Sequence, residues 1–490
     1  MKKSIRFLLF SLCLVLLLCS CDTEQAEVTT ATSNAAVTTA DENTLEIPLA
    51  ADYGKAEYRV LSAGNIVYED FTADEESAQP LDEAQYKRKK LVEQNYNVVI
   101  NEDVKQAYSS GNGPGFTAVY TSTFSGTSTY SAALIAGYDV SVLAYCGCLY
   151  DMNSAPGINL EKSWWDQKAN EALGINDLVF FTAGDYTFAD NDSAYVIMFN
   201  KKILADYGLP NPYDMVYGNQ WTLENFGNLC KTVTEDIDNN GIMDENDRYG
   251  LLVWVDSLLG MVNAAGQRCC EINESGEIVL TLYNETTLDA VDRFLAIALD
   301  KQYALQYQSI QNNVAFEEKL WSGGHGLFWT THMGNVPRFR EMESDFGLLP
   351  YPKLTATQEN YYSTVTPYNS QFVCIPIVQD NIERTGVVTE AIAYYGKKDV
   401  LPVYYDVNLK GRVSRDAESS DMLDIIFDNL VYDIGFLYQI GPYNKNFNYM
   451  VSRGTTNFNS VYDSLLPTAE AQLERINNEY AKAVSIWSNK

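Results

Sequence analysis

The apolar positions of the chain form short runs that alternate with longer segments of helical spacing. Residues 58–61 and 98–100 are apolar runs typical of strands, and Pro80–Tyr96 between them has the length and spacing of a helix. A strand, a helix and a second strand in this order predict that the two strands lie parallel in one sheet. The first part of the protein is therefore expected to be α/β.

The same alternation continues along the rest of the chain. Residues 139–143 have the pattern of a buried strand reached through an alanine-rich helix. Later runs predict strands at 194–199, 250–255 and 371–378, and helices at 287–300, 387–395 and 470–487. With 490 residues the chain is too long for one ordinary core, so we expect two lobes.

Residues 199–250 hold the most specific motifs of the sequence. Asn200-Lys201 ends an apolar run and opens a short helix that Gly208 closes. Thr222 is placed to cap a second helix, because the apolar positions that follow it recur at helical spacing. An acidic loop comes directly after this second helix.

The acidic loop fits the pattern of a calcium-binding loop. Oxygen ligands are expected at alternate positions around a turn glycine, Gly241, because six to eight oxygens must converge on one ion. The candidate Ca²⁺ ligands are Asp236, Asp238, Asn240, the carbonyl of Ile242, Asp244 and Asp247. Asp247 is one methylene shorter than the usual glutamate at its position, and the alternative is a solvated acidic turn.

The order of these motifs, from Asn200-Lys201 through Trp221-Thr222 to Tyr249-Gly250, resembles the middle of the extracellular solute-binding proteins of bacterial ABC importers. The resemblance is to the carbohydrate-directed family 1 and spans residues 45–490 in order and spacing. It implies an α/β, two-lobed, periplasmic-binding-protein-like fold of class II. Each lobe would be a mixed sheet flanked by helices, with a hinge between the lobes.

The resemblance also implies a division of the chain. Residues 45–185 plus 355–400 are expected to form lobe 1, and residues 186–354 plus 401–490 to form lobe 2. Residues 21–44 are rich in Thr, Ala, Glu and Ser, so they are expected to be a disordered tether.

The N-terminus reads as a processing signal, residues 1–20. Basic residues precede the apolar run 7–18, which is too short for a comfortable transmembrane helix. The run ends in Leu18-Cys19-Ser20-Cys21, which resembles a bacterial lipoprotein signal and implies lipidation of Cys21. We therefore expect a protein anchored by acyl chains at the extracytoplasmic face of the cell membrane; the alternative is an ordinary secretory signal.

The charge of the chain excludes some partners. The formal net charge is −31, and removing the three positive charges of Lys2, Lys3 and Arg6 with the signal leaves −34. So acidic a protein is not expected to bind nucleic acid or a strongly anionic ligand. The cysteines lack zinc-site spacing, and only His325 and His332 exist to complement them.

Aromatic side chains supply the candidate ligand contacts. The chain contains 34 Tyr, 20 Phe and 7 Trp, and aromatic rings cover the flat C–H faces of sugars while carboxylates and amides bind the hydroxyls. Most of these rings are expected in the core. The candidates at strand ends or at positions implied by the family are Tyr145, Asp185, Tyr186, Trp254 and Trp329.

We expect capture of a solute rather than catalysis. The sequence has no nucleophile elbow, zinc helix, phosphate-binding loop or dinucleotide fingerprint. The resemblance implies a monomer that delivers a mono- or oligosaccharide to an ABC permease in the membrane. The alternatives are a surface hydrolase that processes glycans and a surface binding lipoprotein without a transport role.

Overall fold

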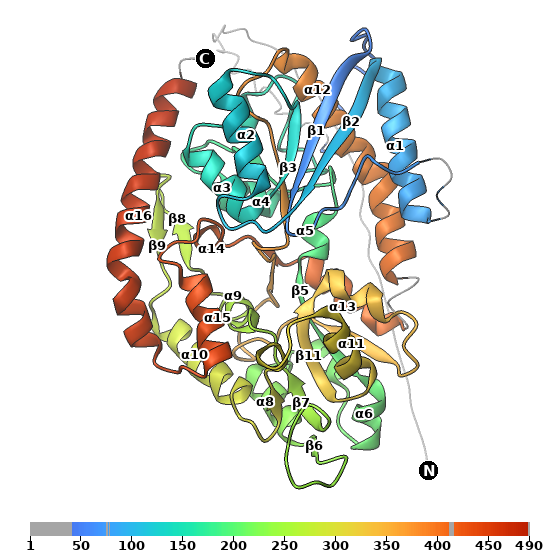
Figure 1. Cartoon of the computed structure of the whole chain (residues 1–490), viewed down its shortest axis with the longest axis vertical. Helices are drawn as coiled ribbons and strands as arrows, with labels where there is room; N and C mark the ends of the chain where they lie inside the picture. Colours follow the sequence, from blue (N-terminus) through green and yellow to red (C-terminus); the bar gives the residue numbers. More distant parts are fainter. Residues whose placement is uncertain (1–41, 75–76, 78, 411–415, 489–490) are drawn as a thin grey trace, which may run out of the picture. The chain divides into compact units, whose positions relative to one another are not determined.

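A computed structural model describes residues 42–74, 77, 79–410 and 416–488 (Figure 1). The signal segment 1–20, Cys21 and most of the tether 21–44 lie outside the described residues. Among the described residues, no helix is both long enough and apolar enough to cross a membrane.

The first sheet has five strands in the order β2-β1-β3-β14-β4. Strand β1 pairs in parallel with β2 and with β3, whereas β14 is antiparallel to both β3 and β4. The bounds are β1 Ala56–Gly64, β2 Val98–Gln106, β3 Ala132–Ala136, β4 Phe181–Thr182 and β14 Gln371–Cys374. The parallel pair expected around Pro80–Tyr96 is therefore confirmed, with this segment as helix α1.

The second sheet has six strands, in the order β10-β7-β11-β5-β12 with β6 paired to β7. Strand β7 is parallel to β10 and β11, and β5 is antiparallel to β11 and β12. The bounds are β5 Tyr195–Asn200, β6 Thr234–Glu235, β7 Arg248–Leu252, β10 Ala304–Leu305, β11 Gly326–His332 and β12 Phe346–Leu349. Both sheets are thus mixed, as expected for this fold class.

Helices flank both sheets (Figure 1). Alternate residues of β3 point to opposite faces: Ala132 and Leu134 pack in the core on the side of α1 and α12, while Ala133 and Ile135 join the core that includes α2 and α3. The helices of the first region are α1 Pro80–Tyr96, α2 Pro114–Ser125, α3 Gly137–Tyr145, α4 Gln167–Leu173, α5 Ala189–Asp192 and α12 Ile382–Tyr395.

The remaining helices follow the second sheet or the end of the chain. They are α6 Lys201–Asp206, α7 Pro212–Tyr217, α8 Leu223–Lys231, α9 Ser257–Ala264, α10 Glu285–Ala298, α11 Val314–Ser322, α13 Ala417–Phe427, α14 Ile434–Leu437, α15 Tyr443–Arg453 and α16 Phe458–Trp487. Helix α8 begins as expected, because the Thr222 hydroxyl accepts a hydrogen bond from the backbone N–H of Asn225 at 3.4 Å.

One sequence-based expectation is wrong. Residues 139–143 were expected to form a strand after an alanine-rich helix, but Ala132–Ala136 is the strand and Gly137–Tyr145 is helix α3. Short apolar runs do not distinguish a buried strand from a buried helix. In the folded protein β1 and β14 pair with Ala132–Ala136 on both sides. The Asp139 carboxylate of α3 accepts hydrogen bonds from the backbone N–H groups of Gly111 and Gly113, just before α2.

Two connections join the large sheets. Residues 183–194 lead from β4 to β5, and residues 350–370 lead from β12 to β14. Within the second connection, β13 Ser363–Thr364 pairs in parallel with β15 Leu430–Val431. The N–H of the next residue, Val365, donates to the carbonyl of Val431 at 2.9 Å. A separate hairpin is formed by β8 Cys270–Ile272 and β9 Ile278–Leu280.

The packing of α8 on β7 generates a testable prediction. A Cβ added at Gly250 would lie 1.9 Å from the carbonyl oxygen of Cys230, so Gly250→Ala should displace backbone and destabilise the protein by about 1–3 kcal/mol or more. Gly208→Ala is the control: Gly208 has φ +61° but open space around it, so only about 1 kcal/mol is expected. Urea denaturation midpoints measure both, and equal losses would contradict the predicted clash.

Candidate functional site

A cavity of about 560 Å³ lies beyond the carboxyl ends of parallel strands from both large sheets. Ile66, Tyr108 and Tyr138 follow β1, β2 and β3, whereas Asp256 follows β7 and His332 ends β11. Open α/β sheets bind ligands at this edge, because the loops after successive parallel strands converge there. The cavity is therefore the strongest candidate for a ligand site.

The lining of this cavity combines amides with aromatic rings. The aromatic residues are Tyr108, Tyr138, Trp254 and Tyr368, and the amide residues are Gln308, Asn312, Asn335, Asn369, Gln439, Asn444 and Asn448. A side-chain amide both donates and accepts hydrogen bonds, so such a wall matches a ligand that carries many hydroxyl groups. The rings offer apolar faces for the rest of the ligand.

Two amide oxygens of helix α15 have no hydrogen-bond partner within the described part of the chain. Asn444 donates through Nδ2 to the Tyr138 hydroxyl at 2.8 Å, but its Oδ1 is buried and unpaired, as is the Oδ1 of Asn448. Buried polar atoms usually have a partner, and leaving one unpaired costs about 1–3 kcal/mol. Both residues line the cavity.

The carboxyl group of Asp256 lines the cavity just after the end of β7. Burial raises its pKa to about 6, and a hydrogen bond with Asn448 opposes the rise. Burial lowers the pKa of His332 to about 4, so this imidazole is neutral at physiological pH. The Arg338 guanidinium is already engaged, since it donates to Glu317 at 3.0 Å and to Glu318 at 3.3 Å.

Of the five residues expected at the site, the structure places one in the cavity lining. Trp254 lines it, with its ring centroid 4.8 Å from that of Tyr195 and 5.7 Å from that of His332. Trp329 lies in the interior of β11, is 1% exposed and donates from Nε1 to the Tyr307 hydroxyl at 3.2 Å.

Tyr186, Asp185 and Tyr145 also lie away from the cavity lining. Tyr186 is fully buried, and its carbonyl accepts a hydrogen bond from Arg88 at 2.8 Å. Burial raises the pKa of Asp185 to about 8, and the Lys397 ammonium 3.9 Å away opposes this rise. Tyr145 ends α3 and accepts a hydrogen bond from Arg475 at 3.1 Å.

Tyr145 lies outside the cavity lining because the strand expected at residues 139–143 lies at Ala132–Ala136 instead. Because β3 ends at Ala136, the strand-end position belongs to Tyr138, and Tyr145 lies about two helical turns further along. The same strand-end rule, applied to the correct strand, would have identified Tyr138 from the sequence. Asn444 and Asn448 carry no comparable signal, since only tertiary packing brings α15 to the cavity.

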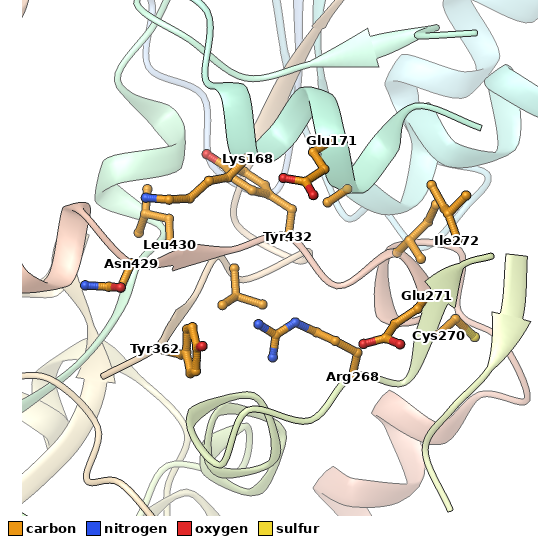
Figure 2. Close-up of a pocket in the computed structure, with 13 residues that line it drawn as sticks. Lys168, Glu171, Arg268, Cys270, Glu271, Ile272, Tyr362, Asn429, Leu430 and Tyr432 are labelled. Carbon is orange, nitrogen blue, oxygen red and sulfur yellow. The ribbon is translucent and has the colours of Figure 1, made fainter. Parts of the chain in front are cut away.

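A second hollow of about 400 Å³ lies elsewhere, between α4, the β8 hairpin and β15 (Figure 2). Its charged residues are of both signs: Lys168 and Arg268 face the same space as Glu171 and Glu271. Arg268 stacks over the Tyr362 ring at 5.2 Å and donates to the carbonyl of Gln267 at 2.8 Å. This hollow does not lie at the carboxyl ends of the large sheets, so the first cavity is favoured.

The acidic loop brings three of its six candidate ligands together. Carboxylate oxygens of Asp236, Asp238 and Asp247 lie within 4.8 Å of one another. Asp236 also accepts from the N–H of Gly241 at 2.8 Å, and buried Asp247 accepts from the N–H of Asp244 at 2.8 Å. With these hydrogen bonds the loop is folded so that the three carboxylate groups lie close together.

The other three candidate ligands have different surroundings. Asn240 accepts through Oδ1 from the N–H of Ile242 at 2.7 Å, and it donates through Nδ2 to Asp238 at 2.9 Å. Asp244 lies outside the group of three and accepts from the N–H of Asn246 at 2.9 Å. Ile242 is exposed.

Comparison with known proteins identifies the fold. No protein-family model and no curated protein sequence matches this chain. An ABC substrate-binding protein from Listeria monocytogenes in complex with cycloalternan is 14% identical, with a TM-score of 0.53 over 88% of this chain and 99% of that chain. The cyclic α-maltosyl-1,6-maltose binding protein from Arthrobacter globiformis is 11% identical, with a TM-score of 0.58 over 86% and 99%.

A third solved structure agrees with these two. The maltose/maltodextrin-binding domain from Bdellovibrio bacteriovorus bound to maltotriose is 11% identical, with a TM-score of 0.52 over 88% of this chain and all of that chain. The protein therefore has the two-lobed α/β fold of the solute-binding proteins of ABC importers, which confirms the expected fold class.

The cavity generates a prediction about pH. Because burial raises the pKa of Asp256 to about 6, its carboxyl is protonated below that pH and ionised above it. Trp254, two residues away, should report this change as a fluorescence titration with a midpoint near pH 6. In Asp256→Asn this titration should be absent, whereas its persistence in the variant would show that another group causes it.

Proposed function

We propose that the protein captures a carbohydrate, either a mono- or an oligosaccharide, and delivers it to an ABC permease. The observation that carries this proposal is the cavity at the strand ends of both sheets, with its aromatic rings and its amides, among them Asn444 and Asn448. Its volume of about 560 Å³ lies within the range of about 300–1,000 Å³ that small-ligand sites occupy.

The three similar structures support a sugar as the ligand. Their descriptions name cycloalternan, cyclic α-maltosyl-1,6-maltose and maltotriose, all of them carbohydrates. The chemistry of this cavity agrees with that class, since hydroxyls can pair with the amides while ring faces lie against Trp254 and Tyr138. We propose binding without turnover, as expected for a protein of this fold.

The cellular setting is part of the same proposal. An acyl anchor at Cys21 would hold the protein at the extracytoplasmic face of the cell membrane, next to its permease. The protein would act there as a monomer. Lobe 1 would comprise residues 45–185 plus 355–400, and lobe 2 residues 186–354 plus 401–490. Closure of these lobes around the sugar by a hinge motion would form the state that the permease recognises.

The ligand assignment is tested by binding. Isothermal titration against a panel of mono- and oligosaccharides should find a sugar, and Trp254→Ala and Asp256→Asn should each weaken its binding about 10- to 100-fold, equivalent to about 1.4–2.8 kcal/mol. Tyr145→Phe is the matched control, because Tyr145 lies outside the cavity lining, and its affinity should be unchanged.

Other results would contradict this function. Product released in excess over protein would make the protein a glycan hydrolase. No binding to any sugar of the panel would favour a surface protein without a transport role. An equal loss of affinity in Tyr145→Phe would move the site away from this cavity.

We also propose that the acidic loop binds Ca²⁺ to stabilise the protein, without contacting the sugar. The clustered carboxylates of Asp236, Asp238 and Asp247 support this proposal, since their mutual repulsion is relieved by a divalent cation. Asn240, Asp244 and the carbonyl of Ile242 would complete the oxygen ligands. The loop joins β6 to β7, whereas the cavity lies beyond the other end of β7.

The calcium proposal predicts a thermal shift. Millimolar Ca²⁺ should raise the melting temperature relative to chelator, because an ion that binds only the folded state stabilises it by mass action. Loops of this type outside the cell bind with Kd of about 10⁻⁴ to 10⁻³ M. Asp236→Ala should abolish the shift, while Asp206→Ala, at an exposed residue of α6, should retain it. Identical melting curves of the wild type in both conditions would leave the loop as a solvated acidic turn.

A further inference from the structure

Three acidic and phenolic side chains meet at the connections between the two large sheets. The Tyr432 hydroxyl lies 2.9 Å from Oδ2 of Asp166 and 3.1 Å from Oδ2 of Asp190. Asp166 precedes α4, Asp190 belongs to α5 in the connection 183–194, and Tyr432 directly follows β15. One hydroxyl thus links three segments that are far apart in the sequence.

The number of protons at this site is limited. A phenol has one proton to donate, and an ionised carboxylate has none. If both carboxylates were ionised, the single phenolic proton would be shared between them in a three-centre bond, and two anions would lie close together in a buried place. Each contact is a full two-centre hydrogen bond only if one carboxyl carries a proton.

The surroundings of the two carboxyls show which one carries the proton. Oδ1 of Asp166 accepts from the N–H groups of Lys168 and Ala169 at 2.8 and 3.0 Å, at the N-terminus of α4, where an anion is favoured. Asp166 is also partly exposed to water. Asp190 is 5% exposed and lies near the negative charge of Asp166, so its ionised form is disfavoured.

We propose that Asp190 keeps a proton well above the pH at which an exposed aspartate loses it, and that the hydrogen-bond chain from Asp190 through Tyr432 to Asp166 is a proton-dependent latch on the connection between the sheets. Asp190 donates to the Tyr432 oxygen, and Tyr432 donates to Asp166. Above neutrality the proton is released to solvent, one of the two contacts is lost, and residues 183–194 are held less firmly. This latch does not depend on the proposed ligand.

Other titratable groups lie around Asp190, and the backbone N–H of Asn191, which donates to its Oδ1 at 2.9 Å, opposes the rise of its pKa. Asp185 and Asp192 flank it in the connection, and the phenols of Tyr68 and Tyr404 face it from neighbouring segments, Tyr404 donating to Asp192 at 2.6 Å. The cations Arg88 and Lys397 act on Asp185 and oppose the rise of its pKa. Burial, and then the charge of Asp166, raise the pKa of Asp190 to about 7.

The sign of the pH dependence follows. The folded state holds the Asp190 proton up to about pH 7, whereas an unfolded aspartate loses it near pH 3.9. The contribution of this proton to stability is therefore complete at acid pH, and it decreases as pH rises toward 7. Other buried carboxyls also titrate, so the informative quantity is the difference in the free energy of unfolding between the wild type and Asp190→Asn. The amide of this variant can donate to Tyr432 at every pH.

The experiment measures the unfolding equilibrium of both proteins between pH 5.5 and 8.5. Over this range the unfolding constant of the wild type should increase about thirtyfold relative to that of Asp190→Asn. This is the effect of one group with a folded pKa of about 7. Carboxyl ¹³C resonances of labelled aspartate, with Asp190 assigned by its loss in the variant, should titrate near pH 7. A constant stability difference, or an Asp190 midpoint below pH 5, would overturn the proposal.

Two further variants test the latch rather than a general effect of burial. Asp166→Asn retains an N-cap but removes the neighbouring charge, so the Asp190 midpoint should move to lower pH; an unchanged midpoint would refute the link. Tyr432→Phe should reduce the pH dependence of amide hydrogen exchange in residues 183–194, after correction for the intrinsic rate. In the wild type this exchange should increase from pH 6 to about pH 7 and then stay constant, and equal exchange at pH 6 and 8.5 would contradict the latch.

Discussion

The parallel pairing of β1 with β2 and β3, and of β7 with β10 and β11, is the constraint on which the candidate site depends. Parallel strands end at one edge of their sheet, so the segments that follow them converge there. In this protein both sheets present that edge to the same cavity. Tyr138 after β3 and Trp254 after β7 reach it from different sheets, without a dedicated binding loop.

The mixed character of each sheet follows from how the chain passes between them. Strands β14 and β5 both run antiparallel to their neighbours and stand next to the connections 350–370 and 183–194. The connection 350–370 contributes to the cavity wall through Tyr368 and Asn369, just before β14. A change in the conformation of this connection would therefore alter the geometry of the candidate site.

Acidic groups have three different physical roles in this molecule. In the loop 236–247 they are close together near the surface, where a cation would relieve their repulsion. In the cavity, burial raises the pKa of the Asp256 carboxyl to about 6. At Asp190 burial and a neighbouring anion act together and raise the pKa to about 7. The high net negative charge of the sequence does not reveal this difference, because it depends on solvent exposure and on neighbours.

The sequence by itself determined the local features. It was sufficient for α1 with its parallel strands, for the cap at Thr222 and for the position of the acidic loop, because periodicity, capping and turn preferences act over a few residues. The order of motifs also indicated the fold class. For the site, these local signals identified Trp254 alone among the residues that line the cavity.

Only the tertiary structure decided the rest. Ala132–Ala136 became a strand because β1 and β14 pair with it on both sides, and this displaced the expected strand end from Tyr145 to Tyr138. Trp329 and Tyr186 occupy the core because neighbouring elements cover them. Asn444 and Asn448 reach the cavity from a helix more than 180 residues beyond Trp254, a distance in sequence over which no local pattern acts. Side chains that meet through packing of distant segments are set by the whole fold, and this is the physical reason that the sequence alone did not identify them.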